Sequence, residues 1–471
     1  MIDLKNLTIE KARKSLLAGE YTAVDLVNAY LENIKNKDEE IHAYLEVFAD
    51  AIDEARKFDT LSKEEKEKLK LGGIPIALKD NILLKGKHCS SASKILEEYV
   101  ASYDAGVVKK LKEAGAIFMG RTNMDEGAMG GSTENSAFGS TKNPIDTTRV
   151  PGGSSGGSAA VVAGDLALVA LGSDTGGSIR QPASYCGIVG LKPTYGSVSR
   201  SGLIAMASSL DVIGPMTKTV EDAEILFDII KGKDILDSTS REGKYESKRE
   251  KKVIGVPRSF IGKGVDSKVL EIFENSLNRF KELGYEIKDI ELPMLPYALS
   301  TYYVIMPAEV SSNLARIDGV RYSTRIEGEN LFESYSKTRG GLFGKEVRRR
   351  IMLGTYVLSS GYYDAYYGKA QSVRAKIQDD FNNAFKDVDF IATPTAPTPA
   401  FKLGKNTSDP LQMYLEDIFT VGANLAGVPA ISIPAGVKNE DGKDLPVGIQ
   451  LMAPLFGEEL LFQAGKKFET I

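Results

Sequence analysis

Residues 73–82, GIPIALKDNI, are the stretch that decides the fold of this 471-residue chain. A short apolar run ends at Lys79 and is bounded by glycine and polar residues, which predicts a buried strand with its polar end at a sheet edge. A helical pattern follows over 107–114, and a second strand-like run, AIFMGRTN, occupies 116–123. This alternation of strands and helices is typical of an α/β layer structure.

The rest of the chain is interpreted as parts of one α/β domain. We expect an N-terminal helical cap over 1–65, a core over 66–230, a charged surface excursion over 231–252 and the remainder of the domain over 253–471. Apolar periodicity predicts helices over 8–36, over 39–58, from about Pro307 and over 345–385.

The composition excludes several classes of function. Lys and Arg number 59 against 64 Asp and Glu, a net charge of -5 that gives no general affinity for nucleic acid. His42, His88, Cys89 and Cys186 are the only histidines and cysteines, too few for a metal site built from them. We therefore predict no metal and a catalytic base other than imidazole.

The same sequence predicts a cytoplasmic protein with no membrane partner. Charged residues begin at Asp3, and no apolar signal region with a small-residue cleavage site follows. The longest apolar run, about 159–171, is interrupted by Asp165 and is too short to span a bilayer.

Two glycine-rich and serine-rich segments are the strongest candidates for chemistry: PGGSSGGSAA at 151–160 and GSDTGGSIRQPA at 172–183. Neither matches a phosphate-binding loop. Glycine allows backbone N–H groups to converge on a ligand, and serine supplies a nucleophile or a proton relay. The base must then be Lys, Asp, Glu or Tyr, and Lys79 is the first candidate. S-x-x-K also occurs at 91–94 and 334–337, but without the partner motifs of β-lactamase-like enzymes.

With CGIVGLKPTYG at 186–196, these motifs resemble the amidase signature family. The resemblance implies a mixed central β-sheet flanked by helices and a Ser-cisSer-Lys triad. Lys79 would be the base, Ser154 the bridging serine after a cis peptide bond from Gly153, and Ser178 the nucleophile that forms the acyl-enzyme. Holding Lys79 neutral near pH 7 requires on the order of 4 to 5 kcal/mol from burial and neighbouring charge.

The resemblance also implies an oxyanion hole in the second motif. Its donors would be the backbone N–H groups of Thr175, Gly176, Gly177 and Ser178. Asp174 and Arg180 would support this loop without reacting.

Three C-terminal stretches, 300–323, 344–370 and 413–434, resemble the glutamine-hydrolysing subunits of tRNA-dependent amidotransferases. This implies that glutamine is the substrate and that B and C subunits complete a heterotrimer. A partner subunit would amidate Glu-tRNA(Gln) with the ammonia, using ATP and Mg, while this chain needs no cofactor. The chain ends at Ile471, slightly earlier than the resemblance leads us to expect.

Glutamine recognition requires a cation for the α-carboxylate and an anion for the α-ammonium. By motif position, Arg350 would bind the carboxylate, Asp417 the ammonium, and Tyr302 would form a wall or donate a hydrogen bond. Gly127 and Ser201 depart from the family pattern, which usually has an aromatic residue at each position. The alternatives are a stand-alone amidase of small carboxamides and an inactive scaffold subunit.

Overall fold

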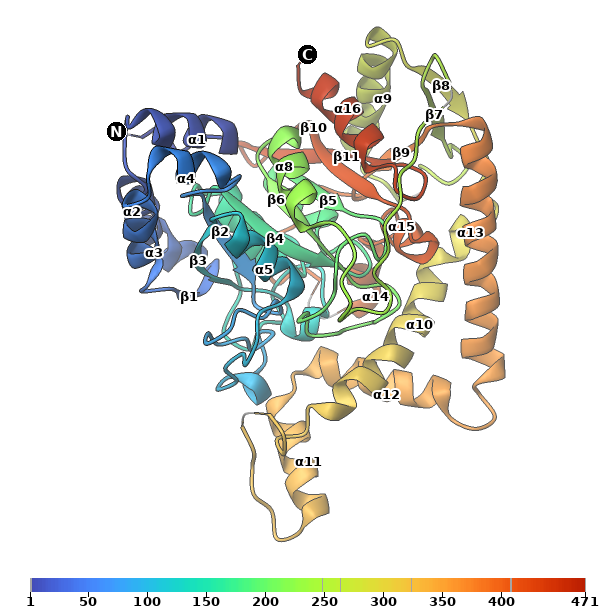
Figure 1. The fold of residues 1–471 in the computed structure, drawn as a ribbon. Coiled ribbons are helices and arrows are strands. Elements are labelled where there is room, and N and C mark those ends of the chain that lie inside the picture. The colour runs from blue at the N-terminus through green and yellow to red at the C-terminus, as the bar shows by residue number, and fades with distance from the viewer. Residues whose placement is uncertain (1, 248, 263, 323, 407–408, 471) are drawn as a thin grey trace.

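A computed structural model describes residues 2–247, 249–262, 264–322, 324–406 and 409–470. Its strands form a mixed sheet in the order β1-β3-β2-β4-β6-β5-β10-β11-β9-β7-β8 (Figure 1). They are β1 (Tyr44–Val47), β2 (Pro75–Lys79), β3 (Ile117–Thr122), β4 (Val169–Asp174), β5 (Val189–Lys192), β6 (Val212–Thr217), β7 (Val253–Val256), β8 (Glu286–Asp289), β9 (Phe390–Pro394), β10 (Ala430–Glu440) and β11 (Lys443–Met452). The predicted mixed sheet flanked by helices is confirmed.

Helices surround this sheet. They include α5 (Gly106–Glu113), α6 (Gly156–Ala163), α7 (Arg180–Cys186), α8 (Val220–Ile230), α9 (Ser267–Glu282), α15 (Val421–Ala426) and α16 (Glu458–Glu469). α6 packs on β2 and β4, α7 packs on β5, β10 and β11, and α8 packs on β6. The described helices include none long and apolar enough to cross a membrane.

A helical lobe extends away from the sheet, with α11 at its tip (Figure 1). It contains α10 (Ala298–Asn313), α11 (Leu331–Leu342), α12 (Lys345–Leu358) and α13 (Lys369–Asp387). Two predictions were wrong here. Pro307 lies inside α10 and does not begin a helix. The predicted helix over 345–385 is two helices, because residues 359–368 form a turn and a short π-helix.

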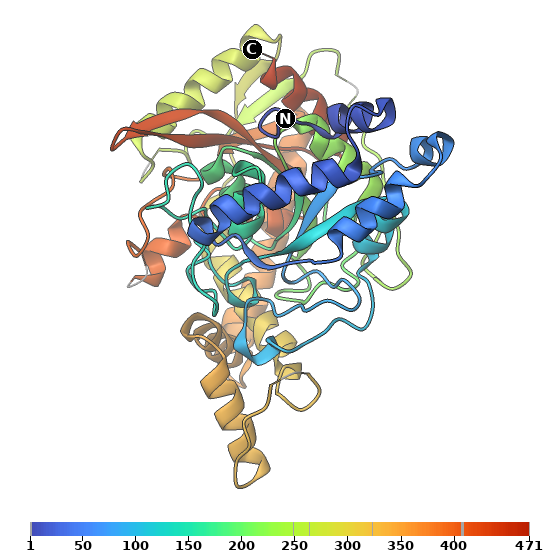
Figure 2. The ribbon, with the colours of Figure 1, turned by 90° about the vertical axis from the view of Figure 1, so that its left-hand side faces the viewer.

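The N-terminal prediction was also partly wrong (Figure 2). Gly19 adopts the left-handed conformation, with φ of 70°, and ends α1 (Ile9–Ala18). Thr22 then forms a capping box that begins α2 (Ala23–Ile41). β1 separates α2 from α3 (Ala51–Asp59), and α4 (Lys63–Lys68) follows. The predicted helices over 8–36 and 39–58 therefore do not exist as single elements.

The fold brings the two glycine-rich motifs to the polar end of Lys79. β2 and β4 are parallel neighbours, buried at every position, and Lys79 and Asp174 are their last residues. α6 begins two residues after Ser154, and α7 begins two residues after Ser178. The carboxyl ends of parallel strands are where binding sites form in such sheets.

Candidate active site

Lys79 is completely buried and makes three polar contacts. Its Nζ atom lies 2.7 Å from Ser154 Oγ, 3.2 Å from the Ser173 carbonyl oxygen and 2.9 Å from Ser173 Oγ. A neutral amine has two N–H groups and one lone pair. The two N–H groups can donate to Ser173 while the lone pair faces the Ser154 hydroxyl, so this geometry suits a lysine that accepts a proton from Ser154.

Burial lowers the pKa of Lys79 to about 7, although the carboxylates of Asp125, Asp174 and Asp211 oppose the shift. Desolvation disfavours the charged ammonium, and nearby negative charges favour it. A pKa near 7 gives Lys79 a substantial neutral fraction at physiological pH, which is the condition for a general base.

We predict that kcat/KM for glutamine falls on the acid side with a midpoint near pH 7. Because the pKa of Lys79 lies at about 7, protonation below that pH removes the base. At pH 5 the neutral fraction, and with it the rate, should be about 100-fold below the plateau. The measurement is initial ammonia release from pH 5 to 9, with folding checked by circular dichroism. A profile that stays level down to pH 5 contradicts a neutral lysine base.

Ser154 is buried, and the peptide bond from Gly153 is cis, as the resemblance implied. The Asp125 N–H donates to the Ser154 carbonyl oxygen at 3.3 Å, and the Gly153 N–H donates to Gln181 Oε1 at 2.9 Å. A Cβ atom on residue 153 would lie 2.1 Å from Asp125 Oδ2. The same Cβ atom would lie 2.6 Å from the Ser132 backbone nitrogen, so glycine is required at 153.

Ser178 differs from the other two triad residues in being partly exposed. Its carbonyl oxygen accepts a hydrogen bond from the Ser155 N–H at 3.1 Å, which joins the two motifs. Within the described residues its hydroxyl makes no hydrogen bond to Ser154, so that link of the relay stays a prediction. Since Lys79 and Ser154 are buried, Ser178 is the triad residue that a substrate can reach.

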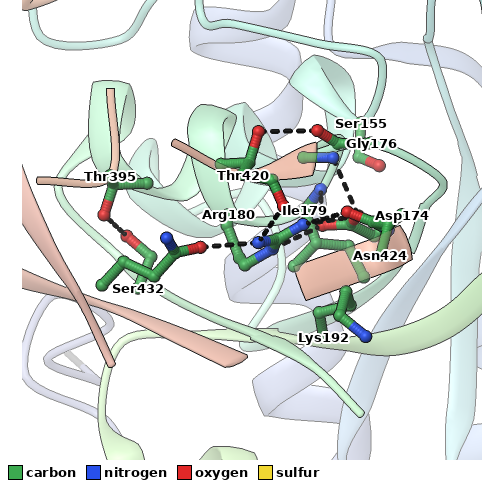
Figure 3. Close-up of polar contacts among 12 residues, drawn as sticks. Ser155, Asp174, Gly176, Ile179, Arg180, Lys192, Thr395, Thr420, Asn424 and Ser432 are labelled. Carbon is green, nitrogen blue, oxygen red and sulfur yellow. Dashed lines mark hydrogen bonds and ion pairs between the residues drawn. The ribbon is translucent and has the colours of Figure 1, made fainter. Parts of the chain in front are cut away.

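The Asp174 carboxylate holds the turn that carries Ser178 (Figure 3). It accepts hydrogen bonds from the N–H groups of Gly177 at 2.9 Å and Ile179 at 3.2 Å, one on each side of the serine. Arg180 donates to both carboxylate oxygens at 3.0 Å. Burial alone would raise the pKa of Asp174, but Arg180 holds it at about 2. The supporting role predicted for Asp174 and Arg180 agrees with these contacts.

The same contacts change the predicted oxyanion hole. The Gly177 N–H is already donated to Asp174, so this structure does not make it available to an oxyanion. The backbone N–H groups of Thr175, Gly176 and Ser178 have no such partner within the described residues, and their role stays a prediction. The Thr175 hydroxyl donates to Asp211 at 2.6 Å and so anchors the turn.

Tyr302 and Tyr303 on α10 connect this turn to the predicted substrate-binding residues. A Cβ atom on Gly176 would lie 2.6 Å from the Tyr302 hydroxyl, so the tyrosine packs directly on the nucleophile turn. The Tyr303 hydroxyl donates to Asp417 at 3.0 Å, and its ring centroid lies 5.4 Å from the Arg350 guanidinium. Contacts through the neighbouring Tyr302 and Tyr303 thus link the turn of Ser178 to Arg350 and Asp417.

Arg350 is nearly buried on α12 and is not part of an exposed basic face. Its Nε donates to Glu346 Oε1 at 2.7 Å, which also accepts the Tyr414 hydroxyl at 2.8 Å. A cleft of about 140 Å³ lies beside it, lined by Arg350, Glu346, Tyr414 and, near Gly153, by Gly130 and Ser132. Glu346 thus fixes the Nε side of the guanidinium, and Arg350 Nη1 lies 3.5 Å from Met306 Sδ.

Several residues of the site were missed from sequence. These are Ser173, Asp125, Glu346, Tyr303 and Tyr414, and each contacts a predicted site residue or its turn. Ser173 lies within GSDTGGS and Asp125 within NMDEG, and both could have been found as polar residues close to a strand end near the triad. Glu346 and Tyr303 lie on helices of the lobe and Tyr414 lies on α14 (Pro410–Leu415), so their contacts join segments far apart in sequence.

The remaining sequence observations lie outside the triad. His88 is 3.4 Å from Glu46, and His42 ends α2. Gly127 adopts a φ of 61°, a conformation that an aromatic residue rarely takes. The Ser201 backbone contacts Ser199 and Gly106, the first residue of α5. The described residues contain no cluster of three or more His, Cys, Asp or Glu that could hold a metal ion.

The fold and the contact between Lys79 and Ser154 are those of an amidase. Comparison with protein families supports the same class. The amidase family matches residues 25–462, and the chain belongs to this family. It is 50% identical to a glutamyl-tRNA(Gln) amidotransferase A subunit of Clostridium acetobutylicum, over 99% of both chains. It is 52% identical to the corresponding A subunit of a Sulfurihydrogenibium species, over 100% of this chain and 98% of that protein. The crystal structure of the Thermotoga maritima A subunit superposes with a TM-score of 0.79 at 44% identity, covering 99% of this chain and 94% of that one.

Proposed function

We propose that this chain is the glutamine-hydrolysing A subunit of a tRNA-dependent amidotransferase. Two relatives named as A subunits of glutamyl-tRNA(Gln) amidotransferase are 50% and 52% identical along almost the whole chain. The observation that carries the proposal is the continuity of the site: Tyr302 packs on the Ser178 turn, and the adjacent Tyr303 contacts both Arg350 and Asp417. An amide with an α-carboxylate and an α-ammonium matches that arrangement.

The reaction begins when Ser178 Oγ attacks the side-chain amide carbon of glutamine. The hydroxyl proton passes to Ser154, whose own proton passes to Lys79. The relay returns a proton to the amide nitrogen, the C–N bond breaks, and ammonia leaves a γ-glutamyl ester on Ser178. Water then hydrolyses the ester by the same relay and releases glutamate. The N–H groups of Thr175, Gly176 and Ser178 stabilise the oxyanion in both steps.

The ammonia is used outside this chain. B and C subunits complete a heterotrimer, and one of these partners binds ATP and Mg, activates Glu-tRNA(Gln) and accepts the ammonia to form Gln-tRNA(Gln). The relatives are named as one lettered subunit of an amidotransferase, which supports a multi-subunit enzyme. Because this activity serves protein synthesis, we place the protein in the cytoplasm.

The test is transfer of nitrogen from glutamine to tRNA. The chain is co-purified with its B and C subunits and supplied with amide-¹⁵N glutamine, ATP, Mg and charged tRNA. We expect ¹⁵N in Gln-tRNA(Gln), and a parallel reaction with Asp-tRNA(Asn) reports the second possible acceptor. The proposal is overturned if the chain releases ammonia from simple carboxamides without its partners and transfers no nitrogen to either tRNA. Such a result would identify a stand-alone amidase.

A further inference from the structure

Helix α12, which carries Glu346 and Arg350, has an N-terminus that its own sequence does not cap. Its N-cap residue is Gly344, which has no side chain to accept a hydrogen bond, and the third helical position is Val347, so no capping box forms. The Gly344 N–H instead donates to Glu126 Oε2 at 2.8 Å, across 218 residues of sequence. Glu126, a residue of the core, thus supplies the hydrogen-bond acceptor that the N-terminus of α12 lacks.

Glu126 is buried, and a second hydrogen bond holds its carboxylate in this position. The residue is 1% exposed, and its other oxygen, Oε1, accepts the Ser93 hydroxyl at 2.5 Å. A Cβ atom on Gly344 would lie 2.3 Å from Glu126 Oε2, although the Gly344 φ of -65° suits any residue. A side chain at 344 would therefore have to displace the Glu126 carboxylate, whereas the backbone conformation there suits any residue.

The contact joins the triad to the carboxylate-binding helix. Glu126 follows Asp125, whose carboxylate lies against Gly153 and accepts the Thr133 N–H at 2.9 Å. At the far end of α12, a Cβ atom on Gly354 would lie 1.8 Å from the Pro307 carbonyl oxygen, so close packing on α10 holds that end. The turn that carries Glu346 and Arg350 lies between these two anchors.

We propose that Glu126 is a positioning residue for glutamine recognition: by capping α12 it sets the place of Arg350 relative to Ser178. The inference rests on the proposed role of Arg350 as the partner of the α-carboxylate. Loss of the cap frees the first turns of α12 and weakens the hold of Arg350 on the carboxylate, while the triad stays in place. Such a change removes ground-state binding, which raises KM and leaves kcat largely unchanged.

The experiment compares two substrates in the full-length enzyme with its partner subunits. Glutamine has an α-carboxylate, and butyramide has the amide without it. For Glu126→Ala we expect KM for glutamine to rise about tenfold with kcat within about twofold, and kcat/KM for butyramide to change less than about twofold. Glu126→Gln should restore glutamine KM, because its carbonyl oxygen can accept the Gly344 N–H and its NH2 group can donate to Ser93.

Ser93→Ala is the matched control, since it removes the second partner of Glu126 and leaves the contact with Gly344. Its glutamine KM should stay within about threefold of wild type. If Glu126→Ala fails to fold, Gly344→Ala tests the same contact, because its methyl group displaces the carboxylate; the same selective rise in glutamine KM is expected. Equal losses for glutamine and butyramide would show a general structural role and overturn the inference.

Arg350→Ala separates this inference from the proposed function. If that variant leaves glutamine KM unchanged, Arg350 does not bind the carboxylate, and the proposed recognition fails along with the inference. If Arg350→Ala raises KM and Glu126→Ala does not, only the positioning role fails. In Glu126→Ala combined with Arg350→Ala, the two effects should not add, because both act on one contact.

Discussion

Ser178→Ala is expected to lower ammonia release from glutamine by at least about 10⁴-fold. The substitution removes the oxygen that would form the γ-glutamyl ester, and no other hydroxyl on this turn takes its place, because Thr175 donates its own to Asp211. The folded state should be unaffected, since Ser178 is partly exposed and the turn is held by backbone contacts to Asp174. The measurement is the initial rate at saturating glutamine.

Two further measurements make this result specific. With hydroxylamine present, the wild-type enzyme should form γ-glutamyl hydroxamate from the ester, whereas Ser178→Ala should form none. Ser201→Ala is the matched serine control, because Ser201 contacts the start of α5 and not the triad; its rate should stay within about twofold of wild type. Ammonia release by Ser178→Ala above about one per cent of the wild-type rate would sink the acyl-enzyme mechanism.

The triad could be predicted from sequence because its signals are local. Lys79 follows an apolar run that indicates a buried strand, and the serines lie between glycines that serve turns or close approaches. The structure places Lys79 as the last residue of β2 and each serine two residues before the start of a helix. Lys79 contacts Ser154 at 2.7 Å, and the Ser155 N–H donates to the Ser178 carbonyl oxygen at 3.1 Å.

Other features depend on contacts that no local pattern reveals. Asp174 takes the Gly177 N–H that was expected in the oxyanion hole, because the aspartate at the end of β4 turns back toward its own loop. The contact between Glu126 and Gly344 joins the core to the lobe and depends on how these two parts of the chain pack. The pairing of Tyr303 with Asp417 has the same origin.

The errors in the helical regions have a related cause. The spacing of apolar residues continues through the end of α1 and through β1. A prediction from this spacing alone does not use Gly19, which ends α1, or Thr22, which caps the start of α2. Proline is common at the first position of a helix, which favours a helix start at Pro307. In the structure α10 begins nine residues earlier, at Ala298, and it packs closely on α12 where Gly354 faces the Pro307 carbonyl oxygen.

Lys79→Met and Lys79→Arg are both expected to lower kcat by about 10³-fold or more, and together they separate two roles for the lysine. A base needs a nitrogen with a free lone pair. Methionine has no such nitrogen, and the guanidinium of arginine stays protonated at all accessible pH values. A fixed cation needs only positive charge, which arginine retains. Because Lys79 touches Ser154 at 2.7 Å and its pKa is lowered to about 7, we expect the first role, so Arg should not rescue activity.

Stability and chemical rescue complete the test of Lys79. Lys79→Met removes a buried amine but leaves Ser154 and Ser173 without that partner, so the free energy of unfolding should change by about 1–3 kcal/mol, measured by urea denaturation. In Lys79→Ala the vacated space can admit methylamine, and added methylamine should restore part of the rate, most strongly where the free amine is unprotonated. Activity retained by Lys79→Arg, or rescue that increases toward acid pH, would show that the enzyme uses the positive charge of Lys79 and not its lone pair.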